Sequence, residues 1–413
     1  MPQLTRRTFL EFASFNRYCL FLALGLLLMF VSLALSGCGG GSSSGPIIST
    51  YAAGSFCFGD AIDSAGNVWV ANGGNGIPGT AAGDSNVTEL SPSGAVIGTY
   101  VAGTVPIGIA IDKSGNVWVE NYGNGIPGTA PGDSNVTELS PSGSVIGTYV
   151  AGRFPAGGIA VDASGNVWVT NWGAPSETPG APGTASTQSN VTELSPSGAT
   201  IGTYVAGSSP GGIAIDSAGN IWVANKGDGI PGLGTTDPMN SNVTELSPSG
   251  AVIGTYVAGS YPEGLAIDPN GNIWVVNKGN GIIGIGPGDS NVTELSPSGA
   301  KIGIYPVGSF PEVVAIDSGG NVWVTNGYGQ GGVSPTYSSV TELSSSGAVL
   351  QTYATGFQPY SIAIDKSGNV WVTNFGSGIA GTTLTDSNVQ VYMGAAKGAQ
   401  YFPYTGPQWP GAE

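Results

Sequence analysis

One pattern of apolar and polar positions recurs along most of this chain. In the copy at residues 106–150, residues 106–112 and 116–119 are almost continuously apolar, and residues 135–139 and 145–150 follow a long Gly-rich stretch. These segments are short and rich in Val, Ile, Thr, Tyr and Trp, which favours β-strands. The first two do not alternate polar with apolar residues, as expected for strands buried on both faces. The pattern predicts four strands in each copy.

The copies follow one another at a nearly constant interval. The motif Gly-Asn-(Val/Ile)-Trp-Val occurs seven times and places its Trp at Trp69, Trp118, Trp168, Trp222, Trp274, Trp323 and Trp371. A period of this size indicates a propeller or a solenoid, and four strands per copy favour the propeller. We therefore predict an all-β fold, a seven-bladed β-propeller of four-stranded antiparallel blades over residues 47–406. Strand-like residues at both ends leave open which terminus closes the ring.

An Asp precedes a short turn ending in Gly-Asn in every copy. An Asp carboxylate at this position can accept hydrogen bonds from backbone N–H groups two or three residues later, while the Gly adopts a positive φ. Seven copies are too many for one active site, so we expect a structural role. The residues are Asp63, Asp112, Asp162, Asp216, Asp268, Asp317 and Asp365.

The whole repeat resembles a known family. Pro-x-Gly-Ile-Ala-Ile-Asp-x-x-Gly-Asn-Val-Trp-Val-x-Asn, followed by Asn-Val-x-x-x-Ser-Pro-x-Gly, is similar to the NHL repeat and to the repeats of streptogramin B lyase. The resemblance implies a ring of blades whose second-to-third and fourth-to-first loops share one face, the top. The lyase family works through a catalytic His with bound magnesium, and this chain has no His. We therefore do not expect that chemistry.

Composition narrows the possible partners. The chain has a net charge of −16, and the part from Cys38 onward carries 7 Lys and Arg against 25 Asp and Glu, a net charge of −18. Such an acidic protein repels phosphate backbones, so nucleic acid is not an expected partner. The missing His also removes the commonest general base and a common metal ligand.

The N-terminal residues predict export and lipidation. Arg6-Arg7 resembles the core of a twin-arginine signal, although an ordinary Sec signal also fits, and an apolar run covers residues 18–35. Leu35-Ser36-Gly37-Cys38 resembles a bacterial lipobox, in which Cys38 is acylated after cleavage. We predict a signal peptide at 1–37, a lipidated Cys and flexible tether at 38–46, and a tail at 407–413. A single membrane-spanning anchor is the alternative.

Two further features of this region refine the expected location and the role of the cysteines. Gly39 is not the Asp that resembles an inner-membrane retention signal, so the resemblance implies the outer membrane of a bacterial envelope. Cys57 is left without a partner, which excludes a disulfide framework.

The repeat is broken where its first strand begins. The residue after the opening Pro is Glu263 and Glu312 in two consecutive copies, but Ile107 and Tyr360 in others. Adjacent blades should bring these carboxylates together at the top of the channel. Carboxylate and amide oxygens suit calcium or magnesium, the only cofactors we consider, although both Glu could simply be solvated loop residues. The candidate ligand set is Glu263, Glu312, Asn277 and Asn326, with Tyr261 and Phe310 placed to stack on a sugar or another ring.

Gly- and Asn-rich loops after the second strands are a further candidate for calcium, or simply form turns. Four copies keep an acidic residue there, namely Asp84, Asp133, Asp289 and Asp386.

These observations indicate a binding or scaffold module more than an enzyme. The copies are nearly identical except in loop length, whereas catalysis should make one or two of them diverge. We expect a monomeric, lipid-anchored envelope protein that binds a protein or a glycan through its top-face loops. The alternative is a metal-dependent lyase or lactonase-type hydrolase with its site at the channel mouth.

Overall fold

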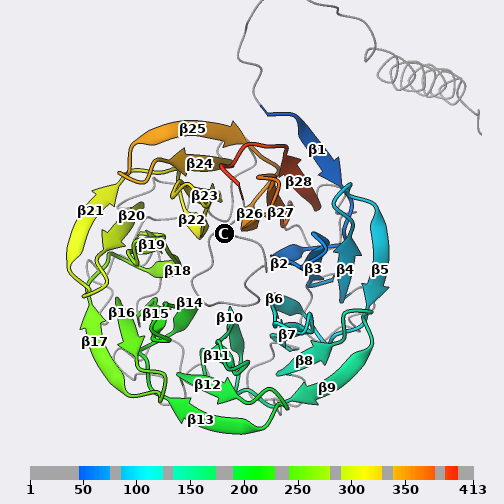
Figure 1. Cartoon of the computed structure of the whole chain (residues 1–413), viewed down its shortest axis with the longest axis horizontal. Helices are drawn as coiled ribbons and strands as arrows, with labels where there is room; N and C mark the ends of the chain where they lie inside the picture. The colour runs from blue at the N-terminus through cyan, green and yellow to red at the C-terminus, as the bar shows by residue number, and fades with distance from the viewer. Residues whose placement is uncertain are drawn as a thin grey trace, which may run out of the picture. The chain divides into compact units, whose positions relative to one another are not determined.

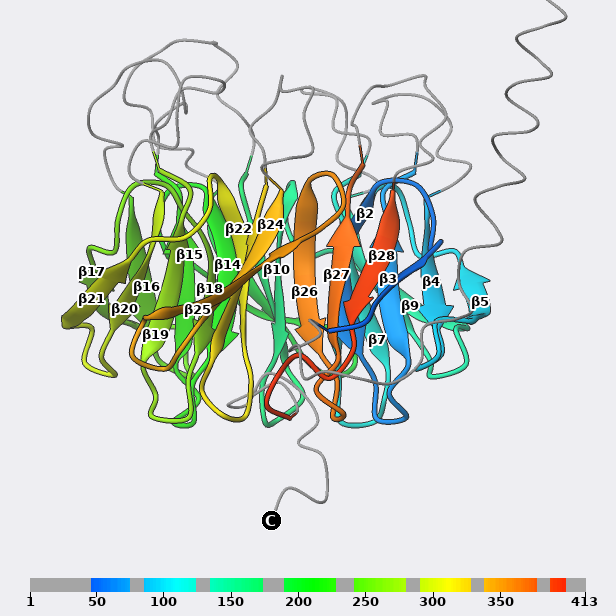
Figure 2. The same ribbon diagram turned by 90° about the horizontal axis from the view of Figure 1, so that it is seen from above.

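The structure is a computed structural model that describes residues 46–398 with seven gaps. The gaps are residues 75–84, 124–133, 174–188, 228–240, 280–289, 328–337 and 377–386. The described residues form seven four-stranded antiparallel sheets arranged radially around a central axis (Figure 1). Seen from the side, the sheets stand roughly parallel to that axis (Figure 2). The predicted seven-bladed propeller is therefore confirmed. No helix in these described ranges is long and apolar enough to span a membrane.

Blades one to six each take four consecutive strands, in chain order from the axis outward, whereas blade seven takes its outermost strand from the N-terminal end of the propeller. Blade one consists of β2 (Cys57–Ile62), β3 (Val68–Asn72), β4 (Asn86–Leu90) and β5 (Val96–Tyr100). Blade two consists of β6 (Pro106–Ile111), β7 (Val117–Asn121), β8 (Asn135–Leu139) and β9 (Val145–Tyr149). Blade three consists of β10 (Pro155–Val161), β11 (Val167–Asn171), β12 (Asn190–Leu194) and β13 (Thr200–Tyr204). Blade four consists of β14 (Pro210–Ile215), β15 (Ile221–Asn225), β16 (Asn242–Leu246) and β17 (Val252–Tyr256). Blade five consists of β18 (Pro262–Ile267), β19 (Ile273–Asn277), β20 (Asn291–Leu295) and β21 (Lys301–Tyr305). Blade six consists of β22 (Pro311–Ile316), β23 (Val322–Asn326), β24 (Ser339–Leu343) and β25 (Val349–Ala354). Blade seven consists of β26 (Pro359–Ile364), β27 (Val370–Asn374), β28 (Asn388–Tyr392) and the N-terminal strand β1 (Ile48–Tyr51).

The N-terminal strand closes the ring. Strand β1 pairs antiparallel with β28 and forms the outermost strand of blade seven, in the order β1-β28-β27-β26. Tyr51 pairs with Val389 and stacks on Trp371, as Tyr100 in blade one pairs with Val87 and stacks on Trp69. The alternative closing segment, residues 399–402, lies outside the described residues.

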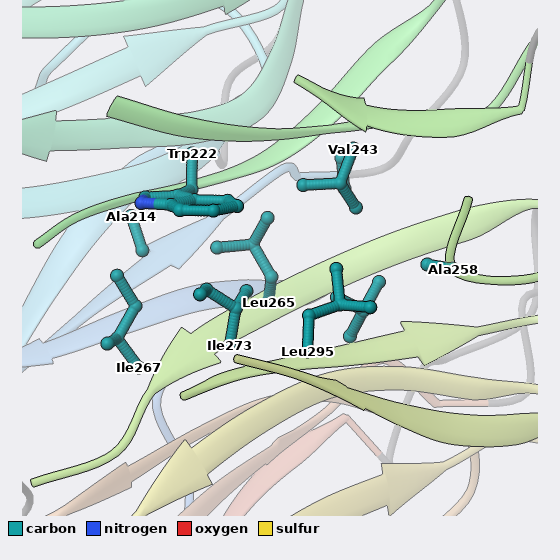
Figure 3. Close-up of a cluster of buried hydrophobic side chains, with 10 residues drawn as sticks. Ala214, Trp222, Val243, Ala258, Leu265, Ile267, Ile273 and Leu295 are labelled. Carbon is teal, nitrogen blue, oxygen red and sulfur yellow. The ribbon is translucent and has the colours of Figure 1, made fainter. Parts of the chain in front are cut away.

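The hydrophobic core lies between neighbouring blades. The seven motif Trp side chains are fully buried, and each packs against the first two strands of the next blade. Figure 3 shows one such layer, in which Trp222 of blade four lies over Leu265, Ile267 and Ile273 of blade five. Apolar residues therefore fill both faces of the inner strands, which explains why these strands do not alternate.

A polar network ties the turn Asp to the core Trp. In blade four, Asp216 Oδ1 accepts hydrogen bonds from the backbone N–H groups of Ala218 and Asn220, at 2.9 and 2.8 Å. Its Oδ2 accepts the indole N–H of Trp222, at 3.1 Å. The same indole bond recurs in the other six blades. A buried indole N–H needs an acceptor, so the Asp holds both the turn and the Trp in place.

Candidate ligand site at the channel mouth

The first strand of each blade starts at the same end of the channel at which the second strand finishes. The register shows this directly, because Pro262 at the start of β18 pairs with Asn277 at the end of β19. First strands lie nearest the axis (Figure 1). Residues that follow the opening Pro and residues that follow the second-strand Asn therefore surround one opening of the channel, which we call the mouth.

Four charged side chains form a continuous chain of ion pairs across blades four, five and six at the mouth. Lys226 Nζ lies 2.5 Å from Glu263 Oε1, and Lys278 Nζ lies 3.7 Å from Glu263 Oε2. Lys278 Nζ also lies 2.7 Å from Glu312 Oε2. We call Lys226, Glu263, Lys278 and Glu312 the ion ladder. The structure thus brings both predicted Glu residues together, with one Lys between them.

The ladder sets the charge states of its members. Burial opposes ionisation of Glu263, but Lys226 and Lys278 outweigh it and hold the Glu263 pKa below its usual value. Burial raises the pKa of Glu312, and the negative charge of Glu263 adds to this although Lys278 opposes it. The two carboxylates hold the pKa of Lys278 above its usual value against the effect of burial. The two Glu residues therefore differ in proton affinity although they share one cation.

Aromatic rings of blades three and five lie beside Lys226 at one end of the ladder. Lys226 Nζ lies 4.7 Å from the ring centre of Trp172 and 6.0 Å from that of Tyr261, within the range of cation–π attraction. Trp172 in turn lies edge-on to Tyr122, with ring centres 6.3 Å apart. All three rings are partly exposed.

Tyr360 faces the ladder from blade seven. Burial raises the pKa of its phenol, and the charges of Glu263 and Glu312 raise it further. Its ring meets Phe58 of blade one edge-on, with ring centres 5.0 Å apart, and Phe58 meets Phe375 at 5.1 Å. Aromatic and charged side chains from all seven blades consequently line the mouth.

The remaining predicted ligand residues point elsewhere. Asn277 and Asn326 are fully buried, and their amide nitrogens donate to the third strand of their own blade, at Thr293 and Thr341. Each amide therefore secures the end of a second strand rather than reaching toward the ladder. Phe310 is also buried, whereas Tyr261 is partly open to solvent.

The donor set does not suit a divalent cation. Both carboxylates face the ammonium groups of Lys226 and Lys278, which would repel a metal ion placed between them. Among residues 46–398 outside the seven gaps, no group of three or more His, Cys, Asp or Glu side chains is placed to hold a metal. The loop residues Asp84, Asp133, Asp289 and Asp386, and Cys38, lie outside the described residues.

Sequence reasoning missed the two Lys residues and Trp172. All three directly follow the Asn that ends a second strand, where Gly73 and Gly327 stand in other copies. Trp172 is also a Trp outside the seven motif positions. Aligning this position across the copies would have found them.

Known structures share this architecture. A streptogramin B lyase structure superposes with a TM-score of 0.60 at 14% identity, covering 84% of this chain and 98% of that one. The chain has the fold of the streptogramin B lyases. Virginiamycin B lyase from Staphylococcus aureus gives a TM-score of 0.58 at 13% identity, covering 84% of this chain and 98% of that one. A chain of the mitotic checkpoint complex gives 0.58 at 12% identity, covering 87% and 99%.

No family model and no curated protein matches the sequence. The structural neighbours include two lyases and a chain of a multi-protein complex, so the shared fold does not assign an activity.

Proposed function

We propose that this chain is a ligand-binding propeller of the bacterial cell envelope, anchored by a lipid on Cys38, and that its mouth binds a glycan. The observation that carries the ligand class is the ion ladder bordered by aromatic rings. Aromatic faces pack against the apolar face of a sugar ring, and charged groups form strong hydrogen bonds with hydroxyl groups. Trp172, Tyr261 and Tyr360 supply the rings beside the ladder.

The charge balance of the ladder favours an uncharged, hydroxyl-rich ligand. Two Lys and two Glu side chains compensate one another, so no net charge remains for an ionic ligand to neutralise. The side chains of Glu263, Lys278 and Glu312 are 14–24% exposed, so the hydroxyl groups of a ligand can reach them. Ion pairs already in place also need little reorganisation on binding, which lowers the cost of association.

A glycan array probed with the acylated protein tests the ligand class. We expect Trp172→Ala to lose glycan binding while the melting temperature stays close to that of the wild type, because Trp172 is at the mouth and outside the core. Lys113→Met is the matched control, since Lys113 is an exposed residue of a first-to-second strand turn, at the opposite end of the blades. Glycan binding that survives Trp172→Ala, or its absence for all glycans while a protein partner is captured through the mouth, would refute the glycan proposal.

A second candidate is an acid–base enzyme acting at the same mouth. Its supporting observation is the opposite pKa shifts of Glu263 and Glu312, since paired carboxylates with separated pKa values are typical of acid–base catalysis. The fold of the lyases is compatible with it. Turnover of a bound glycan or lactone that Glu312→Gln abolishes, with binding retained, would favour this candidate over the binding module.

A further inference from the structure

The exposed apolar side chains of this protein are concentrated on the outer strands. Within the described ranges, every large apolar residue that is exposed lies on an outermost strand or next to its end. The residues are Ile47, Ile48, Val96, Ile97, Val101, Val145, Ile146, Val150, Ile201, Val205, Val252, Ile253, Val257, Ile302, Ile304, Val349 and Leu350. We call the surface formed by the outermost strands the outer rim. Exposed apolar side chains that gather on one surface make it a candidate contact surface.

The outer rim also carries no negative charge. The outermost strands β1, β5, β9, β13, β17, β21 and β25 contain neither Asp nor Glu, and Lys301 is their single charged residue. The whole chain has 26 Asp and Glu residues. Most surfaces of such a protein would be repelled by anionic lipid headgroups, whereas the rim is not.

The lipid anchor enters the propeller at this rim. Ile48, the first residue of β1, pairs with Tyr392, at the end of β28 that lies opposite the mouth. Nine residues lie between Cys38 and Ile48, so the two are ten Cα–Cα steps apart. A Gly- and Ser-rich sequence of ten such steps has an expected end-to-end distance of about 17 Å, and full extension reaches only about 35 Å. An acylated Cys38 would therefore hold β1 close to the lipid surface.

We propose that the rim around β1, formed by β1, β5 and β25, lies against the membrane that holds Cys38. Ile48, Val96, Ile97, Val349 and Leu350 provide its exposed apolar contacts. The anchor enters at the end of blade seven opposite the mouth, so this contact leaves the mouth open to its ligand. This inference rests on the lipid anchor of the proposed function, but not on the identity of the ligand.

The repeats provide a matched pair of positions for a test. Ile97 of blade one and Ile201 of blade three occupy equivalent sites, and each is 52% exposed. Blade one adjoins β1, whereas blade three lies across the ring (Figure 1). Ile97→Cys and Ile201→Cys would each be labelled with an environment-sensitive fluorophore on the acylated protein, because Cys57 is buried and Cys38 would be blocked by lipid. The protein would be bound to phosphatidylethanolamine–phosphatidylglycerol vesicles carrying nitroxide lipid.

We expect a shift to shorter emission wavelength and loss of intensity for the label at position 97, and little change at position 201. Equal responses at both positions, whether strong or absent, would overturn the proposed contact while leaving the anchor intact. Failure of the protein to float with the vesicles would overturn both the anchor and the contact. Shielding that occurs without vesicles and depends on protein concentration would show a second copy on the rim, and would also overturn the proposal.

Discussion

Removing the central cation of the ion ladder should lower the stability of this protein more at pH 7 than at pH 5. Lys278 contacts both Glu263 and Glu312, and among the described residues it is the only Lys that pairs with Glu312. Glu263 keeps Lys226 as a partner when Lys278 is replaced by Met. The Lys278→Met variant therefore leaves one carboxylate, that of Glu312, without its ion pair beside another negative charge.

The size of the effect depends on whether the Glu312 carboxyl group stays ionised or takes up a proton. Breaking a buried ion pair costs about 3–5 kcal/mol if the remaining charge stays ionised. Taking up a proton at pH 7 costs about 3.7 kcal/mol for a carboxyl group with an ordinary pKa, which limits the loss. Glu312 is 16% exposed, so some hydration remains. We expect a loss of about 2–3 kcal/mol at pH 7 and about 1 kcal/mol at pH 5.

The sign of this pH dependence follows from linkage. Burial already raises the pKa of Glu312 in the folded wild type, and loss of Lys278, which opposes this, raises it further, so the folded variant binds more protons than the folded wild type. Stability of the variant relative to wild type is therefore lost as the pH rises from the unfolded pKa toward the folded one. Urea unfolding followed by Trp fluorescence at pH 5 and pH 7 measures it, with Lys113→Met as the control.

A second substitution isolates the cause. Adding Glu312→Gln to Lys278→Met should recover most of the stability at pH 7, because no unpaired charge then remains. A loss of stability that is the same at both pH values, or that Glu312→Gln leaves unchanged, would refute the electrostatic account and indicate lost packing of the Lys278 side chain instead.

Three further outcomes are expected. Cys38→Ala should release the protein from membranes or leave an uncleaved precursor, and intact-mass analysis showing cleavage elsewhere without an acyl chain would contradict lipidation. Asp216→Ala should lower the free energy of unfolding by about 2–3 kcal/mol, because it leaves the Trp222 indole N–H and two backbone N–H groups without their acceptor, while glycan binding persists. Addition of calcium or magnesium should leave the melting temperature unchanged. A rise in melting temperature that is absent from the double variant Glu263→Gln, Glu312→Gln would instead establish a metal site at the ladder.

The mouth shows how far a comparison of the repeats reaches. Aligned copies reveal the positions that differ, and this alone places Glu263 and Glu312 on neighbouring first strands. The same comparison does not show that Asn277 turns away into the third strand, because the direction of a buried amide depends on which acceptors surround it. Nor does it show that Lys226 reaches Glu263, 37 residues later in the chain.

The sequence by itself determined the blades, because strand patterns, turn residues and the seven-fold period are local and repeated. Asp216 and Trp222, six residues apart, illustrate such a local relation. Only the tertiary structure decided that β1 closes the ring, since strand-like residues at both ends fit the same sheet edge equally well. It also decided the ion ladder, because the closed ring brings side chains of three blades into contact. No local sequence pattern gives the distances between those side chains.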